Sequence, residues 1–166
     1  MCGIEINYHC PHWQSLEGNI AQIVTDAAAA ALADQGLMAG DADENYEISI
    51  VLADDAFVRD LNRTWRNIDR PTNVLSFPAG DGGGQGPCLL GDVVLAYETV
   101  QREAVAQGKQ VLDHVAHLVV HGTLHLLGFD HEAENEAIEM ETLETALLAR
   151  LGIVDPYQRG LDKSGV

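Results

Sequence analysis

The chain has 166 residues, 46% of them hydrophobic, so it is long enough for one domain with its own apolar core. Its 26 acidic residues against 9 Lys and Arg give a formal net charge of −17, which disfavours nonspecific binding to polyanions such as nucleic acids. The longest uncharged apolar run, residues 27–33, is too short to span a bilayer, and we expect no signal peptide in the first residues. The three cysteines form no CxxC pair, which is typical of a reducing compartment, and we expect a cytoplasmic protein.

The first half of the chain predicts alternating strands and helices. Residues 4–8 alternate between apolar and polar side chains as in a strand, and a helix is expected from 15 to about 37. A second strand is expected at 46–52, before Asp54, which is a good N-cap for the next helix. The side chains that this helix should turn inward are Phe57, Leu61 and Trp65, and a turn is expected at 67–72.

The second half continues the same pattern. The predicted elements are strands at 74–77 and 89–96 and helices at 98–107, 112–127 and 132–151. Polar or glycine-rich loops are expected at 41–45 and 80–87, and residues 155–166 read as a loose tail. No repeat or domain linker interrupts the chain. We therefore predict one α+β domain over residues 1–166, with about four strands in a mixed sheet packed with helices, and leave the strand order open.

Three histidines in the segment 121–131 indicate a metal site. His121 and His125 are four residues apart, so a helix places both imidazoles on one face. Gly128 can end that helix in the left-handed conformation, after which the chain turns back and His131 can approach the same point. Three imidazoles around one open corner are a common zinc arrangement, and water can be activated at the open corner. We predict one Zn²⁺ held by these three histidines, on a helix that resembles those of zinc-dependent hydrolases.

Three further residues near this motif are candidates for supporting roles. His114 and His117 fall on the same helical stripe as the first two ligands, and Asp130 directly precedes the third. Each is a candidate for orienting a ligand histidine, and the two histidines are also candidates for meeting the substrate. A structural or solvated role stays open for all three.

Four of the nine basic residues gather in one short segment, on the polar side of the helix predicted after Asp54. They are Arg59, Arg63, Arg66 and Arg70. Arginine donates paired hydrogen bonds to phosphate from a planar fork, so the segment indicates a local site for an anionic substrate. The alternative is an ordinary solvated basic face of an amphipathic helix.

The histidine spacing resembles that of the metzincin metalloproteases, but with one decisive difference. Those enzymes place Glu directly after the first histidine as the general base, where this chain has Gly122. Without that carboxylate, peptide hydrolysis is disfavoured. The sequence names no substitute for this base.

Two longer motifs carry a closer resemblance. They are HGTLHLLGFDH at 121–131 and PTNVLSFP at 71–78, accompanied by Leu61-Asn62, Trp65-Arg66, Leu90-Gly91-Asp92 and Asp155-Pro156-Tyr157. Together they resemble the YbeY family of bacterial metal-dependent endoribonucleases, which take part in ribosomal RNA maturation. The resemblance runs from about residue 46 to 157. Two departures are small: Trp65 stands where the family often has Tyr, and residues 80–86 are unusually rich in glycine.

The resemblance implies a site and a function. It implies zinc at His121, His125 and His131, an essential Arg66 near the cleft, and Ser76 as a residue that lines it and binds substrate. The implied function is a zinc-dependent, single-strand-specific endoribonuclease in ribosomal RNA processing, maturation and ribosome quality control. Its partners would be single-stranded RNA and ribosomal RNA precursors, with a ribosomal subunit or assembly proteins as further candidates and no membrane. The alternatives are an RNA-binding ribosome-assembly factor with a mainly structural metal and, less favoured, a metalloprotease.

Overall fold

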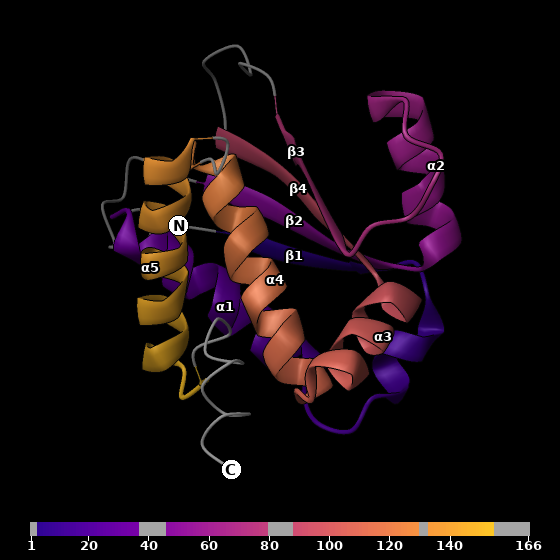
Figure 1. Ribbon diagram of the computed structural model, residues 1–166, viewed down its shortest axis with the longest axis horizontal. Coiled ribbons are helices and arrows are strands. Elements are labelled where there is room, and N and C mark those ends of the chain that lie inside the picture. The colour runs from indigo at the N-terminus through magenta and orange to yellow at the C-terminus, as the bar shows by residue number, and fades with distance from the viewer. Residues whose placement is uncertain (1–2, 37–45, 80–87, 130–132, 155–166) are drawn as a thin grey trace.

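A computed structural model describes residues 3–36, 46–79, 88–129 and 133–154. In this part of the chain a four-stranded mixed sheet is packed with helices, which confirms the predicted α+β class (Figure 1). The predicted loops at 41–45 and 80–87 and the tail at 155–166 lie outside the described residues. No helix within the described ranges is long and apolar enough to cross a membrane.

The strands follow the order β1-β2-β4-β3. The first three in this order, β1 (Gly3–Tyr8), β2 (Tyr46–Ala53) and β4 (Cys88–Ala96), are parallel to one another. The fourth, β3 (Val74–Pro78), pairs antiparallel with β4 and forms one edge of the sheet. All four strands lie where the alternation of side chains predicts them.

The described residues also form one 3₁₀ helix and five α-helices, of which three follow the last strand. They are η1 (Pro11–Ser15), α1 (Ile20–Asp34), α2 (Asp55–Arg66), α3 (Tyr97–Gln107), α4 (Val111–Leu126) and α5 (Glu134–Arg150). Figure 1 shows α4 alongside the sheet between α5 and α3, with α2 apart from them beyond the strands.

Alternation along β2 and β4 sends side chains into two separate cores. On one face, Ile50 and Leu95 are fully buried in the main core together with α1, α4 and α5. On the other face, Val94 and Ala96 pack against Val58 of α2 in a smaller core. Full burial of one such aliphatic side chain contributes about 1.5–3 kcal/mol. The larger core holds α4 against the sheet, and the smaller one holds α2 on the opposite face.

The helix predicted from residue 15 begins later than expected. Residues 11–15 form the short η1, and α1 starts at Ile20. Gly18 interrupts the chain with a φ of +105°, and the side-chain oxygen of Asn19 accepts a hydrogen bond from the Gln22 N–H at 3.1 Å. Asn19 is therefore the N-cap of α1, and the residues before it do not belong to this helix, although the sequence predicted a start at residue 15.

The predicted inward orientation of Trp65 is wrong, whereas the predicted turn after the helix is confirmed. Trp65 is 70% exposed and Ile68 is 38% exposed. The face of α2 that packs against the sheet is centred on Val58 and Asn62, and the Asn62 amide donates to the Arg70 carbonyl at 2.9 Å. The helix also ends before Ile68, because Asn67 adopts the left-handed conformation with a φ of 60°. The predicted Asp54 cap is confirmed, since its carboxylate accepts from the Phe57 N–H.

Candidate active site

Helix α4 packs tightly against the sheet at Gly122, which lies between two of the predicted metal ligands. A Cβ at this position would lie 2.6 Å from Val93 Cγ1 and 3.1 Å from Ser76 Oγ. The Ser76 hydroxyl donates a hydrogen bond to the Gly122 carbonyl at 3.0 Å, which ties β3 to the helix. Glycine is therefore required for close packing here. A glutamate, the general base of a metalloprotease, does not fit at this position.

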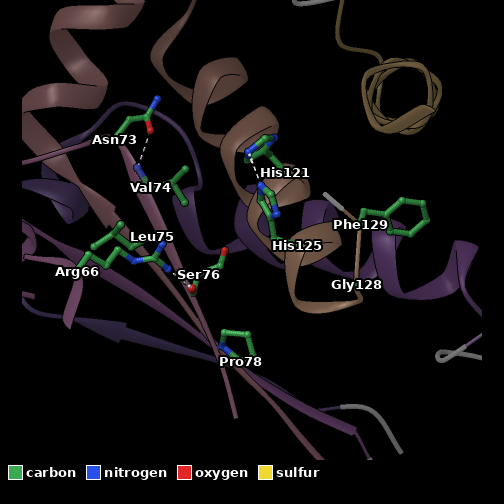
Figure 2. Close-up of a pocket in the computed structure, with 10 residues that line it drawn as sticks. All are labelled: Arg66, Asn73, Val74, Leu75, Ser76, Pro78, His121, His125, Gly128 and Phe129. Atoms are coloured by element: carbon green, nitrogen blue, oxygen red, sulfur yellow. Dashed lines mark hydrogen bonds between the residues drawn. The ribbon is translucent and has the colours of Figure 1, made fainter. Parts of the chain in front are cut away.

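His121 and His125 project from α4 into one cleft, as the spacing predicts (Figure 2). Their Nε2 atoms lie 3.1 Å apart, and their rings meet edge to face. The Nδ1 atom of His121 contacts the Glu144 carboxylate. Because a carboxylate only accepts hydrogen bonds, the neutral ring of His121 carries its proton on Nδ1 in this contact and keeps its lone pair on Nε2. The Nε2 atom of His121 is thus in the form that binds a metal.

Glu144 supplies this carboxylate from the middle of α5 and is fully buried. One of its oxygens contacts His121 Nδ1, and the other lies 3.5 Å from His117 Nε2. A buried carboxylate needs such partners, and a carboxylate behind a histidine is a common support for a metal ligand. Sequence analysis missed this residue. The pattern that could have identified it is its position on α5: Glu144 is an acidic residue on the face of the helix that otherwise buries Met140, Leu147 and Leu148.

The other histidine candidate, His114, belongs to a separate network. It is 3% exposed, and its Nε2 lies 2.9 Å from a Glu103 oxygen that also accepts from the Asn73 amide. Burial lowers the pKa of His114, and the hydrogen bond with Glu103 offsets part of this effect. His114 therefore links α3, α4 and the start of β3. Of the three supporting candidates, His117 contacts Glu144, whereas Asp130 lies outside the described residues.

The cleft has a volume of about 550 Å³ and lies between α4 and β3, with Arg66 on the side opposite the histidines (Figure 2). Arg66 Nη2 donates to the Ser76 carbonyl at 2.9 Å, and the guanidinium carbon lies 5.3 Å from the centre of the Phe77 ring. These two contacts position an exposed side chain and leave further N–H donors for a ligand. Among the described residues that line the cleft, none is an aspartate or a glutamate.

Ser76 lines the cleft as predicted from the resemblance, but its proton is already used. Because its hydroxyl donates to the Gly122 carbonyl, only its lone pairs are available to a ligand. Ser76 is therefore suited to accept a hydrogen bond from a substrate, such as one from a ribose hydroxyl. Its backbone carbonyl meanwhile holds Arg66.

The remaining arginines of the basic segment do not line this cleft. Arg59 pairs with Asp69 at 2.8 Å, and Arg63 pairs with Asp60 within α2. The hydrogen bond from Arg59 lowers the pKa of the Asp69 carboxyl, which keeps the pair ionised. Arg70 lies in a neighbouring hollow on the other side of Arg66. The structure thus singles out Arg66 as the arginine that faces the two histidines.

The spacing of the histidine pair fits zinc, the metal that the sequence predicts. Zinc with Zn–N bonds of 2.0–2.1 Å and tetrahedral angles separates two ligand nitrogens by about 3.3 Å. The observed 3.1 Å between the Nε2 atoms of His121 and His125 is close to this value. The third predicted ligand, His131, lies outside the described residues, and within them no group of three His, Cys, Asp or Glu side chains is placed to hold a metal.

Gly128 ends α4 in the way that the motif predicts. Its φ is +101°, its N–H donates to the His125 carbonyl at 3.1 Å, and the Phe129 N–H donates to the Leu124 carbonyl at 3.0 Å. These two bonds form a Schellman motif, which reverses the chain directly after the second histidine. A Cβ at Gly128 would meet no atom within 4 Å, so the backbone conformation alone requires glycine here.

We expect Gly128→Val to lower both the free energy of unfolding and the affinity for zinc. The left-handed conformation costs an L-residue about 1–2 kcal/mol, and a relaxed turn would misdirect the chain that leads to His131. Gly152→Val is a matched control, because Gly152 ends α5 with a φ of +79° and the same pair of hydrogen bonds. Urea unfolding should show similar losses in both variants, whereas zinc competition titration should show weaker binding only in Gly128→Val. Equal zinc affinities would contradict this role of the turn.

Comparisons with known proteins identify the family. The family model described as "Endoribonuclease YbeY" matches residues 12–152. A Methylocella silvestris protein named Endoribonuclease YbeY is 61% identical over 115 residues, which cover 69% of this chain and 65% of that protein. One of the same name from Azorhizobium caulinodans is 55% identical over 146 residues, 87% of this chain and 89% of that protein. The solution structure of TM1509 from Thermotoga maritima, 20% identical with a TM-score of 0.54, covers 91% of each chain and has the same fold. This chain therefore belongs to the endoribonuclease YbeY family, which confirms the resemblance seen in its motifs.

Proposed function

We propose that this chain is a zinc-dependent endoribonuclease that cuts single-stranded RNA, with ribosomal RNA precursors as its substrate. The observation that carries the proposal is the cleft in which the paired Nε2 atoms of His121 and His125 face the guanidinium of Arg66. Membership of the endoribonuclease YbeY family supports it. The strongly acidic composition also favours a single local contact with RNA over broad binding along a duplex.

The proposal gives the histidines, Glu144 and Arg66 separate parts in the reaction. His121 and His125 would hold zinc through Nε2, with His131 as the third ligand, and Glu144 would keep His121 in the required tautomer. Zinc bound there would supply a Lewis acid for activating water or polarising a phosphate oxygen. Arg66 donates hydrogen bonds to the phosphate and stabilises the negative charge that builds on its oxygens during cleavage.

The described lining of the cleft, which contains no carboxylate, limits the choice of nucleophile. Without a carboxylate base, cleavage depends either on water activated at the metal or on attack by the neighbouring ribose 2′-hydroxyl, for which Ser76 is placed as a hydrogen-bond acceptor. Attack by the ribose leaves a 2′,3′-cyclic phosphate, whereas attack by water leaves an open phosphate. The end groups of the RNA products therefore distinguish the two routes.

Metal analysis combined with RNA cleavage tests the proposal. The purified chain should contain zinc, should cut a defined single-stranded RNA and spare the matching duplex, and should lose cleavage on chelation and regain it with added zinc. His121→Ala should lose both the metal and cleavage. Cleavage that persists in both the chelated protein and His121→Ala would assign the activity to a contaminating nuclease. Zinc and RNA binding without cleavage would instead establish the alternative of an assembly factor with a structural metal.

A further inference from the structure

A second groove lies on the opposite face of the sheet from the histidines. It has a volume of about 550 Å³ and runs between α2 and the strands. Its apolar wall carries three aromatic rings, those of Phe57, Trp65 and Phe77, and its floor carries the polar side chains of Ser49 and Asp92. Trp65 is 70% exposed here, although it is one of the largest apolar side chains in the chain.

This groove adjoins the candidate active site at the edge strand β3. Pro78 lines both cavities. The alternation of β3 directs Ser76 to the histidine cleft and Phe77 to the groove, and the Arg66 guanidinium lies over the Phe77 ring while it lines the cleft. Trp65 precedes Arg66 in α2 and lines the groove. An extended polymer that passes Arg66 in the cleft therefore meets Trp65 next.

The chemistry of the groove suits a nucleobase and not a phosphate. The exposed carboxylate of Asp92 repels a phosphate, whereas aromatic walls stack on bases of any sequence. Hydrogen-bond acceptors on the floor bind the exocyclic amino group of a base, and Asp92 supplies such an acceptor. Two other arginines of α2, Arg59 and Arg63, are paired with aspartates and do not line the groove.

We propose that this groove binds a base of the same RNA strand that is cut in the cleft, with the base stacked on Trp65 and the sugar-phosphate chain passing Arg66. This inference rests on the proposed function for its substrate. Trp65 is a binding residue outside the reacting centre, so it contributes to affinity and not to the chemical step. Because uracil has no exocyclic amino group, Asp92 makes cytosine a better occupant than uracil.

The two tryptophans of the chain provide a direct test, since Trp13 is fully buried and Trp65 is exposed. The probe is a 2′-O-methyl oligonucleotide of about ten nucleotides, which resists cleavage and is long enough to fill both cavities. Binding should quench the emission of Trp65 in the wild type. Trp65→Ala should weaken binding roughly 5- to 150-fold, the range for one stacked base, and Trp65→Phe should restore most of it. Val105→Ala, at an 80% exposed position on α3, should bind as the wild type does.

Kinetics and base preference complete the test. Trp65→Ala should raise KM for a cleavable RNA and leave kcat unchanged, and Asp92→Asn should reduce the preference of the chain for a cytidine over a uridine oligonucleotide. Unchanged affinity in Trp65→Ala, or unquenched Trp65 at saturating oligonucleotide, would overturn the inference and leave the groove to another occupant, such as a protein. The binding measurements also work on chelated protein, so absence of cleavage would refute the proposed function alone.

Discussion

Arg66→Ala should lower kcat for RNA cleavage by about 100- to 1,000-fold, the usual cost of removing one donor that stabilises charge in a transition state. Arg66 is the arginine that faces the two histidines, and its contacts with the Ser76 carbonyl and the Phe77 ring direct it there. The side chain is exposed, so the free energy of unfolding should change by less than about 1 kcal/mol. Single-turnover cleavage, urea unfolding and zinc analysis measure the three quantities separately.

Arg63→Ala is the matched control for this variant. Arg63 lies on the same helix, is also exposed and is paired with Asp60, away from the cleft. It should leave kcat unchanged. Arg66→Lys keeps the charge and loses the planar fork, so its kcat should lie between those of the wild type and Arg66→Ala. If Arg66→Ala and Arg63→Ala cleave RNA equally fast, Arg66 has no part in the reaction.

Glu144→Ala should weaken zinc binding about 10- to 100-fold, because this carboxylate orients His121 and fixes its tautomer. It should also lower the free energy of unfolding of the zinc-free protein by about 1–3 kcal/mol, since it removes the acceptor of two partly buried imidazoles, those of His117 and His121. Glu144→Gln has nearly the same volume and keeps one acceptor oxygen. It should show a smaller loss of both quantities, and it provides the measurement if the alanine variant does not fold.

Glu141→Ala, at an exposed position on α5, is the control for these variants and should bind zinc as the wild type does. Excess zinc separates the two functional residues. It should restore most of the cleavage in the Glu144 variants, whose defect is loss of metal, and none in Arg66→Ala. Zinc affinity that is unchanged in both Glu144→Ala and Glu144→Gln would show that the buried carboxylate serves packing alone.

The parts of the site that sequence analysis predicts are those fixed by local geometry. A spacing of four residues on a helix is enough to bring His121 and His125 together, and a glycine after the helix is enough to predict its end at Gly128. The strands follow from alternation in the same way. These features depend on residues that are close together in the chain, so a single sequence is enough to predict them.

The parts that sequence analysis misses depend on contacts between distant elements. Glu144 reaches His121 from another helix, and no local pattern predicts that pairing. The orientation of Trp65 depends on how α2 is rotated against the sheet, which Val58 and the buried Asn62 decide. Sequence analysis interprets Gly122 only as a missing base, whereas the structure shows that α4 packs here against Val93 and Ser76 with no room for a side chain.

The contact at Gly122 couples the two sides of the cleft mechanically. Helix α4 carries both imidazoles and contacts Ser76 of β3. The Ser76 hydroxyl donates to the Gly122 carbonyl of α4, and the Ser76 carbonyl accepts from Arg66. A shift of the helix away from the sheet would therefore pull on the support of the guanidinium as well as on the imidazoles. The alignment of the reacting groups therefore depends on how closely α4 packs against the strands at Gly122. An apolar substitution at this contact would disturb the alignment even though it changes no polar atom.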